Sequence, residues 1–198
     1  MAPKKLKNKA TKASIRKPTR PAKNVAKKAA KKIAKTAKGV TKPTAAKSLL
    51  GKPAPNFSLP LDDGGTLSLT SLRGKRVVLY FYPKDDTPGC TVEACAFRDR
   101  LPGFSGANAA VIGVSKDSVA SHSKFRTKFK LNFPLASDDG KVCEAYGVWK
   151  QKSMYGRTYM GIERSTFIID EHGSVRAEWR KVSVAGHADE VSKALAVL

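Results

Sequence analysis

The sequence predicts an α/β fold in which a mixed central sheet is flanked by helices, with a basic N-terminal tail in front of it. Short apolar runs of strand length recur along the chain, and segments with helical spacing of apolar residues lie between them. Because strands that alternate with helices bury both faces of a sheet, this order favours an α/β domain over an all-helical or all-β one. The composition changes near residue 48, so we expect a tail over 1–47 and a folded domain over 48–198.

The tail is a low-complexity segment of Lys, Ala, Thr and Pro. It holds 17 of the 38 Lys and Arg residues and none of the 16 acidic ones, so most of the net charge of +22 belongs to it. Large apolar side chains are few, and their burial cannot offset the entropy lost when such a segment becomes ordered. We therefore expect residues 1–47 to be disordered when no partner is bound.

A series of positive charges without a negative one predicts a polyanionic partner. We expect non-specific contact with the backbone of DNA or RNA through residues 1–47, because the segment has no aromatic residue for base stacking. Two alternatives stay open, a solubilising arm and a transit peptide, although 15 Lys and only 2 Arg are unlike the Arg-rich leaders of organelle import. The expected location is the cytoplasm or nucleoid of a bacterium or, since Lys clusters can act as an address, the nucleus of a eukaryote.

Four strands and four helices are expected in the domain, each from its own pattern. Residues 77–82 and 109–115 are almost continuously apolar, which is typical of strands buried on both faces of a sheet. Within 118–130, apolar side chains recur every three or four positions, as on the buried face of a helix. Pro102 is expected to end the first helix, because proline lacks the N–H that the helix needs. The expected strands are 77–82, 109–115, 165–170 and 174–180, and the expected helices are 91–100, 118–130, 138–147 and 186–198.

Cys90 occupies the position where a buried strand has ended, a turn has passed and a helix begins. In an open α/β sheet, ligands bind at this edge. Unpaired N–H groups and the positive end of the helix dipole favour the thiolate, which is the reactive form of the side chain. We therefore expect a reactive thiol at Cys90, since three cysteines in a chain of 198 residues are too few for a disulfide scaffold.

Cys95 follows five positions later, in a C-x4-C pattern. On one regular helix the two Cα atoms lie roughly 8–9 Å apart, beyond the limit of about 7 Å for a disulfide. The two sulfurs therefore either never pair or pair only after the helix unwinds locally. An alternative interpretation is two small side chains that fill one side of a helix. A zinc site is less favoured, because there is no second Cys pair and His122, His172 and His187 show no ligand spacing.

The segment from Phe81 to Asp99, FYPKDDTPGCTVEACAFRD, resembles the active-site signature of the peroxiredoxins, most closely that of the bacterioferritin comigratory protein or peroxiredoxin Q subfamily. The resemblance extends from about Gly51 to Leu198. It includes three further segments, which are PAPNFSL at 53–59, VCEAYGVW at 142–149 and GIERSTFIID at 161–170. The resemblance implies a thioredoxin-like fold, in agreement with the pattern of strands and helices.

The same resemblance implies a role for five residues. Cys90 matches the peroxidatic cysteine, which attacks the peroxide bond and becomes a sulfenic acid. Cys95 matches the resolving cysteine of those members that carry it on the same helix. Thr87 matches the residue whose hydroxyl binds peroxide, and Pro83 the residue that shields the thiolate from water. Arg164 matches the arginine that keeps the thiolate ionised and polarises the peroxide.

The implied function is a thiol-dependent peroxidase of antioxidant defence that reduces hydrogen peroxide and organic hydroperoxides. A Cys90–Cys95 disulfide would be recycled by thioredoxin or a similar dithiol. This chemistry needs no metal, flavin or haem, and because both cysteines belong to one chain we expect a monomer. Two other classes stay in view: a nucleic-acid-binding protein whose folded domain is redox-inert, and a disulfide reductase, which the missing C-x-x-C motif disfavours.

Other side chains are expected to be structural. Cys143 is expected to be a packed, inert thiol, with an accessory redox or intermolecular role left open. Trp149 and Trp179 are expected to fill the core or its rim. Asp85 and Asp86 are expected to be solvated acids of the turn before the reactive thiol. No run of about 18 apolar residues is present, so no membrane partner is expected.

Overall fold

A computed structural model of the chain describes residues 48–154 and 156–198. The expected tail, its boundary and its disorder lie outside the described residues and stay predictions. Within the described part of the chain, no helix has the length and apolar character needed to cross a membrane.

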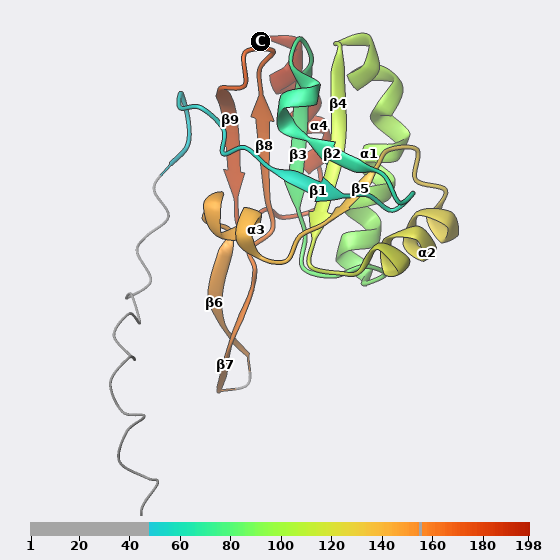
Figure 1. The fold of residues 1–198 in the computed structure, drawn as a ribbon, viewed down its shortest axis with the longest axis vertical. Coiled ribbons are helices and arrows are strands. Elements are labelled where there is room, and N and C mark those ends of the chain that lie inside the picture. The colour runs from blue at the N-terminus through green and yellow to red at the C-terminus, as the bar shows by residue number, and fades with distance from the viewer. Residues whose placement is uncertain (1–47, 155) are drawn as a thin grey trace, which may run out of the picture. The chain divides into compact units, whose positions relative to one another are not determined.

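The domain is built on a five-stranded sheet with the strand order β5-β4-β3-β8-β9 (Figure 1). Strands β3, β4 and β5 run parallel, whereas β8 and β9 are antiparallel to their neighbours. The bounds are β3 (Arg76–Phe81), β4 (Ala109–Ser115), β5 (Leu135–Ser137), β8 (Ser165–Ile169) and β9 (Val175–Arg180). The sheet is therefore mixed and central, as the sequence predicted.

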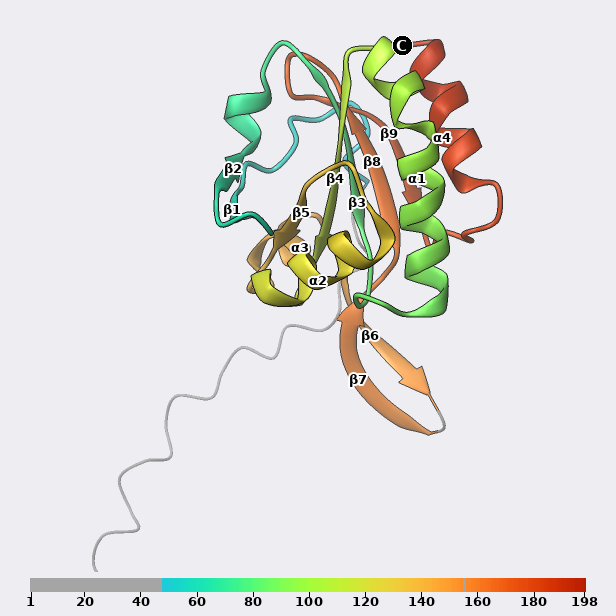
Figure 2. The ribbon, with the colours of Figure 1, turned by 90° about the vertical axis from the view of Figure 1, so that its right-hand side faces the viewer.

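Both faces of the sheet are covered, and each cover forms its own apolar core. Helices α1 and α4 lie side by side along one face (Figure 2), where α2 also contributes to the core. The opposite face is covered by α3, a short 3₁₀ helix and the β1–β2 hairpin. The bounds are α1 (Pro88–Gly106), α2 (Val119–Phe129), α3 (Lys141–Ala145), α4 (His187–Ala196), η1 (Leu69–Leu72), β1 (Ser58–Pro60) and β2 (Thr66–Ser68).

Most expected elements are confirmed within a few residues, and α2 shows why its pattern was informative. The hydroxyl of Ser118 accepts a hydrogen bond from the backbone N–H of Ser121 and so caps the first turn. Lys130 ends the helix in the left-handed conformation. Phe125, at the predicted apolar spacing, is buried in the core. Local sequence therefore specifies both ends of this helix and its buried face.

The expected end of the first helix at Pro102 is wrong, because α1 continues through Pro102 to Gly106. Proline removes the N–H that would have bonded to the carbonyl of Arg98. The side-chain amide of Asn132 donates to that carbonyl instead, at 3.4 Å. Beyond the proline, Phe104 is only 1% exposed and packs in the core. The hydrogen bond from Asn132 and the burial of Phe104 thus stabilise the helix beyond Pro102.

The β6–β7 hairpin was not expected from the sequence. Strands β6 (Trp149–Met154) and β7 (Arg157–Ile162) pair antiparallel and project from the body of the domain (Figure 1). Among the described side chains of the hairpin, those of Trp149 and Ile162 at its base pack against the core. A largely exposed hairpin has no alternating apolar pattern, so periodicity gives no signal for it. Strands β1, β2 and β5, each of three residues, are too short to be recognised in the same way.

Replacing Gly113 with alanine tests the close packing between β4 and its neighbours. A Cβ at this position would lie 2.6 Å from the Tyr80 hydroxyl and 2.8 Å from a methyl carbon of Leu135. We expect Gly113→Ala to lower the free energy of unfolding by about 1–3 kcal/mol in urea denaturation. The matched change Gly103→Ala adds a Cβ in open space on helix α1 and should raise it by about 0.5–1 kcal/mol. Equal stability of the two variants would contradict the described packing.

Candidate active site

The register of the central sheet brings Cys90 and Arg164 together, although 74 positions separate them. Strands β3 and β8 are antiparallel neighbours, and Phe81 at the end of β3 pairs with Ser165 at the start of β8. The loop and first turn of α1 that follow β3 therefore lie beside the residue that precedes β8. Cys90 lies in the first turn of α1. Pro88 begins this helix, at a position where the N–H that proline lacks would have no partner within the helix.

The sulfur of Cys90 is buried against a fixed positive charge. Cys90 is 2% exposed, and Nη2 of Arg164 donates to its Sγ at 3.1 Å. A guanidinium in this position, together with the N-terminus of α1, favours a negative charge on the sulfur. Burial strengthens this interaction, because screening by water is weak there. The predicted pairing of these two residues is thus present in the structure.

Glu93 is a third member of the site, which the sequence analysis did not identify. Its carboxylate accepts a hydrogen bond from Nη1 of Arg164, and the residue is 2% exposed. Burial raises the pKa of Glu93 to about 7, although the charge of Arg164 works in the opposite direction. The signal in the sequence is the spacing, because residues three apart lie on the same side of a helix and Glu93 follows Cys90 by three.

Arg164 therefore serves two acids at once. Burial would lower the pKa of the guanidinium, but Glu93 and Cys90 raise it, so Arg164 stays charged. Because the pKa of Glu93 lies near 7, its carboxyl is only partly ionised at neutral pH. Arg164 then faces an acid that carries less than a full negative charge, while its Nη2 donates to the Cys90 sulfur.

Thr87 and Pro83 lie on the loop between β3 and α1. Thr87 is the N-cap residue of α1, but its hydroxyl makes no capping bond and donates instead to the carbonyl of Lys84 at 3.1 Å. Pro83 is exposed, two residues after the end of β3. The loop thus places both residues within a few positions of Cys90. Their expected roles, binding peroxide and excluding water, stay predictions.

Cys95 lies on the same continuous helix as Cys90, and both thiols are free. Cys90 is buried, whereas Cys95 is half-buried. Five positions along an intact helix place the two Cα atoms too far apart for a disulfide. This conformation therefore suits a reduced site that is ready to react, and pairing needs the first turns of α1 to unwind.

Cys143 lies elsewhere, in α3, and is completely buried. Burial, together with a nearby Asp138 carboxylate, raises the pKa of its thiol far above the ordinary value. A buried thiol that does not ionise is a poor nucleophile. The expectation of a packed side chain is confirmed.

The expectation of a solvated Asp85 is wrong. Asp85 is 7% exposed, and its carboxylate accepts hydrogen bonds from Tyr82, Ser121 and His122. A turn acid becomes buried here because α2 supplies two donors from a distant part of the sequence. The neighbouring Asp86 is exposed, as expected, and forms an ion pair with Lys128 at 2.6 Å.

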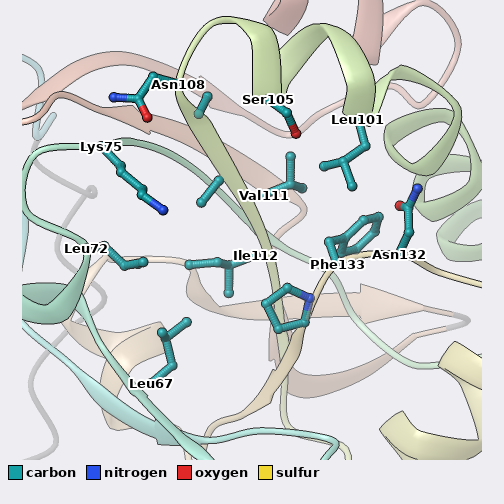
Figure 3. Close-up of a pocket in the computed structure, with 13 residues that line it drawn as sticks. Leu67, Leu72, Lys75, Leu101, Ser105, Asn108, Val111, Ile112, Asn132 and Phe133 are labelled. Carbon is teal, nitrogen blue, oxygen red and sulfur yellow. The ribbon is translucent and has the colours of Figure 1, made fainter.

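A cavity of about 330 Å³, whose lining residues are shown in Figure 3, lies at the end of the sheet away from Cys90. It lies around the start of β4, which pairs with the start of β3, whereas Cys90 follows the end of β3. Its walls are mostly apolar, with Leu67, Ile112 and Phe133 among them. The described residues that line it include no cysteine, histidine or acid, so the chemistry does not belong there.

Known proteins resemble this chain over most of the folded domain. The model of the AhpC/TSA family matches residues 50–178. A putative peroxiredoxin Bcp of Coxiella burnetii is 56% identical over 143 residues, which cover 72% of this chain and 95% of the relative. Peroxiredoxin Bcp of Bacillus subtilis is 51% identical over 147 residues, covering 74% of this chain and 94% of the relative.

Solved structures agree with these matches. The bacterioferritin comigratory protein of Xanthomonas campestris, a structure described for alkyl peroxide reduction activity, is 48% identical. It superposes with a TM-score of 0.69 and covers 71% of this chain and 90% of its own. A peroxiredoxin Q of Xylella fastidiosa is 42% identical with a TM-score of 0.72, over 75% of this chain and 95% of its own. The thioredoxin-like fold implied by the sequence is thereby confirmed.

The raised pKa of Glu93 predicts how stability depends on pH. The unfolded carboxyl loses its proton near pH 4.5, whereas the folded one keeps it until about pH 7. Between these pH values the unfolded state binds fewer protons than the folded state, so the free energy of unfolding falls as pH rises. Above pH 7 the Glu93 carboxyl causes no further change. The total change is at most roughly 3 kcal/mol.

We expect Glu93→Gln to remove this slope when free energies of unfolding are measured from pH 4 to pH 8. Both proteins carry Cys90→Ser, so that ionisation of the sulfur does not contribute. The matched change at exposed Glu144, Glu144→Gln, should keep the slope. A parent and a Glu93→Gln variant with parallel pH profiles would show that the carboxyl titrates normally.

Proposed function

The chain belongs to the AhpC/TSA family and is a peroxiredoxin of the Bcp or peroxiredoxin Q type, which makes it a thiol peroxidase. From this premise we propose that the sulfur of Cys90 reduces the peroxide. The observation that carries this proposal is the 3.1 Å contact between Arg164 and the buried Cys90 sulfur. Hydrogen peroxide and organic hydroperoxides are the proposed substrates. The proposed role in the cell is antioxidant defence.

In the first step, the Cys90 thiolate attacks the terminal oxygen of the hydroperoxide. An S–O bond forms while the O–O bond breaks, so the sulfur is oxidised by two electrons to a sulfenic acid and the peroxide is reduced. The other oxygen leaves as an alkoxide or hydroxide and takes up a proton to become an alcohol or water. Arg164 stabilises the charge that moves from sulfur to oxygen, because its guanidinium is already in place beside the sulfur.

Glu93 and the loop residues support this step. Glu93 holds one side of the Arg164 guanidinium, which leaves Nη2 directed at the sulfur. Such a two-point hold fixes the planar group better than a single contact. Thr87 is proposed to bind the peroxide through its hydroxyl, and Pro83 to limit the access of water.

In the second step, the Cys95 thiol attacks the Cys90 sulfenic acid. A disulfide forms, and the sulfenic oxygen leaves as water. The first turns of α1 must unwind for this, which separates Cys90 and Glu93 from Arg164 and exposes Ala94, now 1% exposed. The lost contacts explain why the helix stays folded until the sulfur has reacted.

The third step returns the enzyme to its reduced form. A thioredoxin or similar dithiol attacks the Cys90–Cys95 disulfide, is itself oxidised to a disulfide and restores both thiols. Unwinding of α1 presents the bond to this partner. Because one chain holds both cysteines, we propose that a monomer completes the cycle.

Two single substitutions separate the steps. We expect Cys90→Ser to abolish hydroperoxide consumption in an assay with thioredoxin, thioredoxin reductase and NADPH. Cys95→Ser should still consume about one equivalent of peroxide and then be recycled poorly by thioredoxin, because no disulfide can form. Mass spectrometry of the peroxide-treated parent should find residues 90 and 95 linked. Full turnover by Cys90→Ser would refute the assignment of Cys90, whereas a parent protein that consumes no hydroperoxide would favour a redox-inert domain.

We further propose that the N-terminal tail binds nucleic acid without sequence preference and so places the enzyme at a nucleoid or on chromatin. The support is compositional: 17 positive charges and no negative one within 47 residues. Each phosphate that the tail neutralises adds about −0.9 to the slope of log K against log salt on duplex DNA. An enzyme held there would remove peroxide close to the nucleic acid.

A gel-shift titration tests the tail. The full-length protein should bind duplex DNA of arbitrary sequence, and its affinity should fall steeply as salt is raised, because binding releases counterions. A truncated protein that begins at Ser48 should bind at least tenfold more weakly while retaining its peroxidase activity. Equal affinities would dismiss the tether and favour a solubilising arm or an import signal.

A further inference from the structure

A buried carboxylate fastens the loop between β3 and α1 to helix α2. Asp85 lies in the middle of this loop, two residues before Thr87. Its Oδ1 accepts a hydrogen bond from the Tyr82 hydroxyl at 2.7 Å, and its Oδ2 accepts one from the Ser121 hydroxyl at 2.7 Å. The ring nitrogen Nδ1 of His122 lies 2.9 Å from Oδ2. Three donors therefore converge on one side chain, and two of them come from α2.

The backbone of the loop is tied down at the same point. The N–H of Asp85 donates to Oδ2 of Asp117 at 2.8 Å. Asp117 is held in turn by the Ser115 hydroxyl, at 2.7 Å, at the end of β4. The loop is thus joined through both its backbone and its side chain to elements that take no part in the chemistry.

The His122 ring makes its hydrogen bond to Asp85 in a fully buried position. The ring is completely buried, and its other nitrogen, Nε2, has no hydrogen-bond partner among the described residues. Burial would raise the pKa of Asp85, but the hydrogen bonds from His122, Tyr82 and Ser121 outweigh it and hold the pKa below its ordinary value. The loop is therefore anchored by an ionised carboxylate at neutral pH.

The position of this anchor matters because α1 must unwind between its two cysteines. On the C-terminal side of the segment that unwinds, Phe97 is completely buried, and the centre of its ring lies 4.9 Å from that of Tyr80. Asp85 lies on the N-terminal side of this segment. Between them, Asp86 has a φ of 52°, a left-handed conformation that marks a change in chain direction directly after the anchor.

We propose that Asp85 is a positioning residue of the peroxidase reaction: its contacts with Tyr82, Ser121 and His122 fix the loop of Pro83 and Thr87 on α2 and set the N-terminal limit of the segment that unwinds. The proposal rests on the proposed roles of Cys90 and Cys95. The anchor holds the reactive turn in place for attack on peroxide. During disulfide formation it keeps the unwinding from spreading into β3.

Asp85→Asn tests the anchor, with Asp86→Asn as the matched control. Asparagine keeps the shape of aspartate but removes the charge and places an N–H₂ group among donors. The control changes the next residue of the same loop, whose side chain is exposed and pairs with Lys128. Asparagine also tolerates the left-handed backbone of residue 86.

Two rate constants are measured for each variant by stopped flow. The second-order rate constant for oxidation of Cys90 by hydrogen peroxide is taken in a Cys95→Ser background, where no disulfide forms. The first-order rate constant for disulfide formation is taken with Cys95 present. We expect Asp85→Asn to lower the rate constant for Cys90 oxidation at least tenfold without lowering the rate constant for disulfide formation. The control Asp86→Asn should change each rate constant by less than twofold.

The split between the two rate constants distinguishes positioning from a structural role. Equal loss in both, matched by a loss of folded protein, would show that Asp85 only stabilises the fold and would overturn the proposal. Unchanged rate constants would overturn it as well. Where Asp85→Asn does not fold, Ser121→Ala removes one donor and should give the same split at a smaller size. A parent protein whose Cys90 does not react with peroxide would instead refute the proposed function.

Hydrogen exchange examines the limit of unwinding. In the parent protein with Cys90 and Cys95 joined, amides over 87–96 should exchange faster than in the reduced protein, whereas the Asp85 amide should stay protected. In oxidised Ser121→Ala, protection of the Asp85 amide should fall. Fast exchange at Asp85 in the oxidised parent would show that the anchor opens with the helix, and would contradict the proposal.

Discussion

The active site depends on one buried guanidinium that is shared between two acids. Arg164 contacts the sulfur of Cys90 with one nitrogen and the carboxylate of Glu93 with another. Burial favours the neutral form of the Glu93 carboxyl and raises its pKa to about 7, although the charge of Arg164 works in the opposite direction. The carboxyl of Glu93 is therefore only partly ionised at neutral pH, while Nη2 of Arg164 donates to the Cys90 sulfur.

The same arrangement constrains helix α1, which in the proposed cycle stays folded while the Cys90 thiol reacts and unwinds afterwards. Its later turns are firmly packed, since Phe97 and Phe104 are buried in the core next to α4. Its first turn is weak by composition: Thr87 makes no side-chain cap, and Gly89 follows Pro88. An alanine at position 89 would fit sterically, because its Cβ would meet Arg164 only at an ordinary 3.5 Å. The glycine therefore weakens the turn rather than relieving a clash.

Arg164 restrains the weak first turn of α1, and Asp85 restrains the loop that precedes it. Arg164 contacts Cys90 and Glu93 of this turn, and in the proposed cycle these contacts are lost when the Cys90 sulfur is oxidised and the turn unwinds. Asp85 grips the loop before it through α2, by contacts that involve no reacting atom. One restraint thus responds to the chemistry and the other does not. This difference allows a local opening without loss of the sheet beneath it.

The sequence by itself determined the strands at 77–82 and 109–115, the thiol at the start of a helix and the spacing that forbids a disulfide on an intact helix. These properties follow from local patterns, because strand burial, helix start and helical rise depend on neighbours in the chain. The resemblance to a known motif also identified Arg164. Only the tertiary structure decided that Asp85 is buried, that Glu93 shares the arginine and that α1 continues past Pro102. Each of these depends on a partner far away in the sequence, such as His122, Arg164 or Asn132, and an acid or a proline carries no local sign that such a partner will arrive.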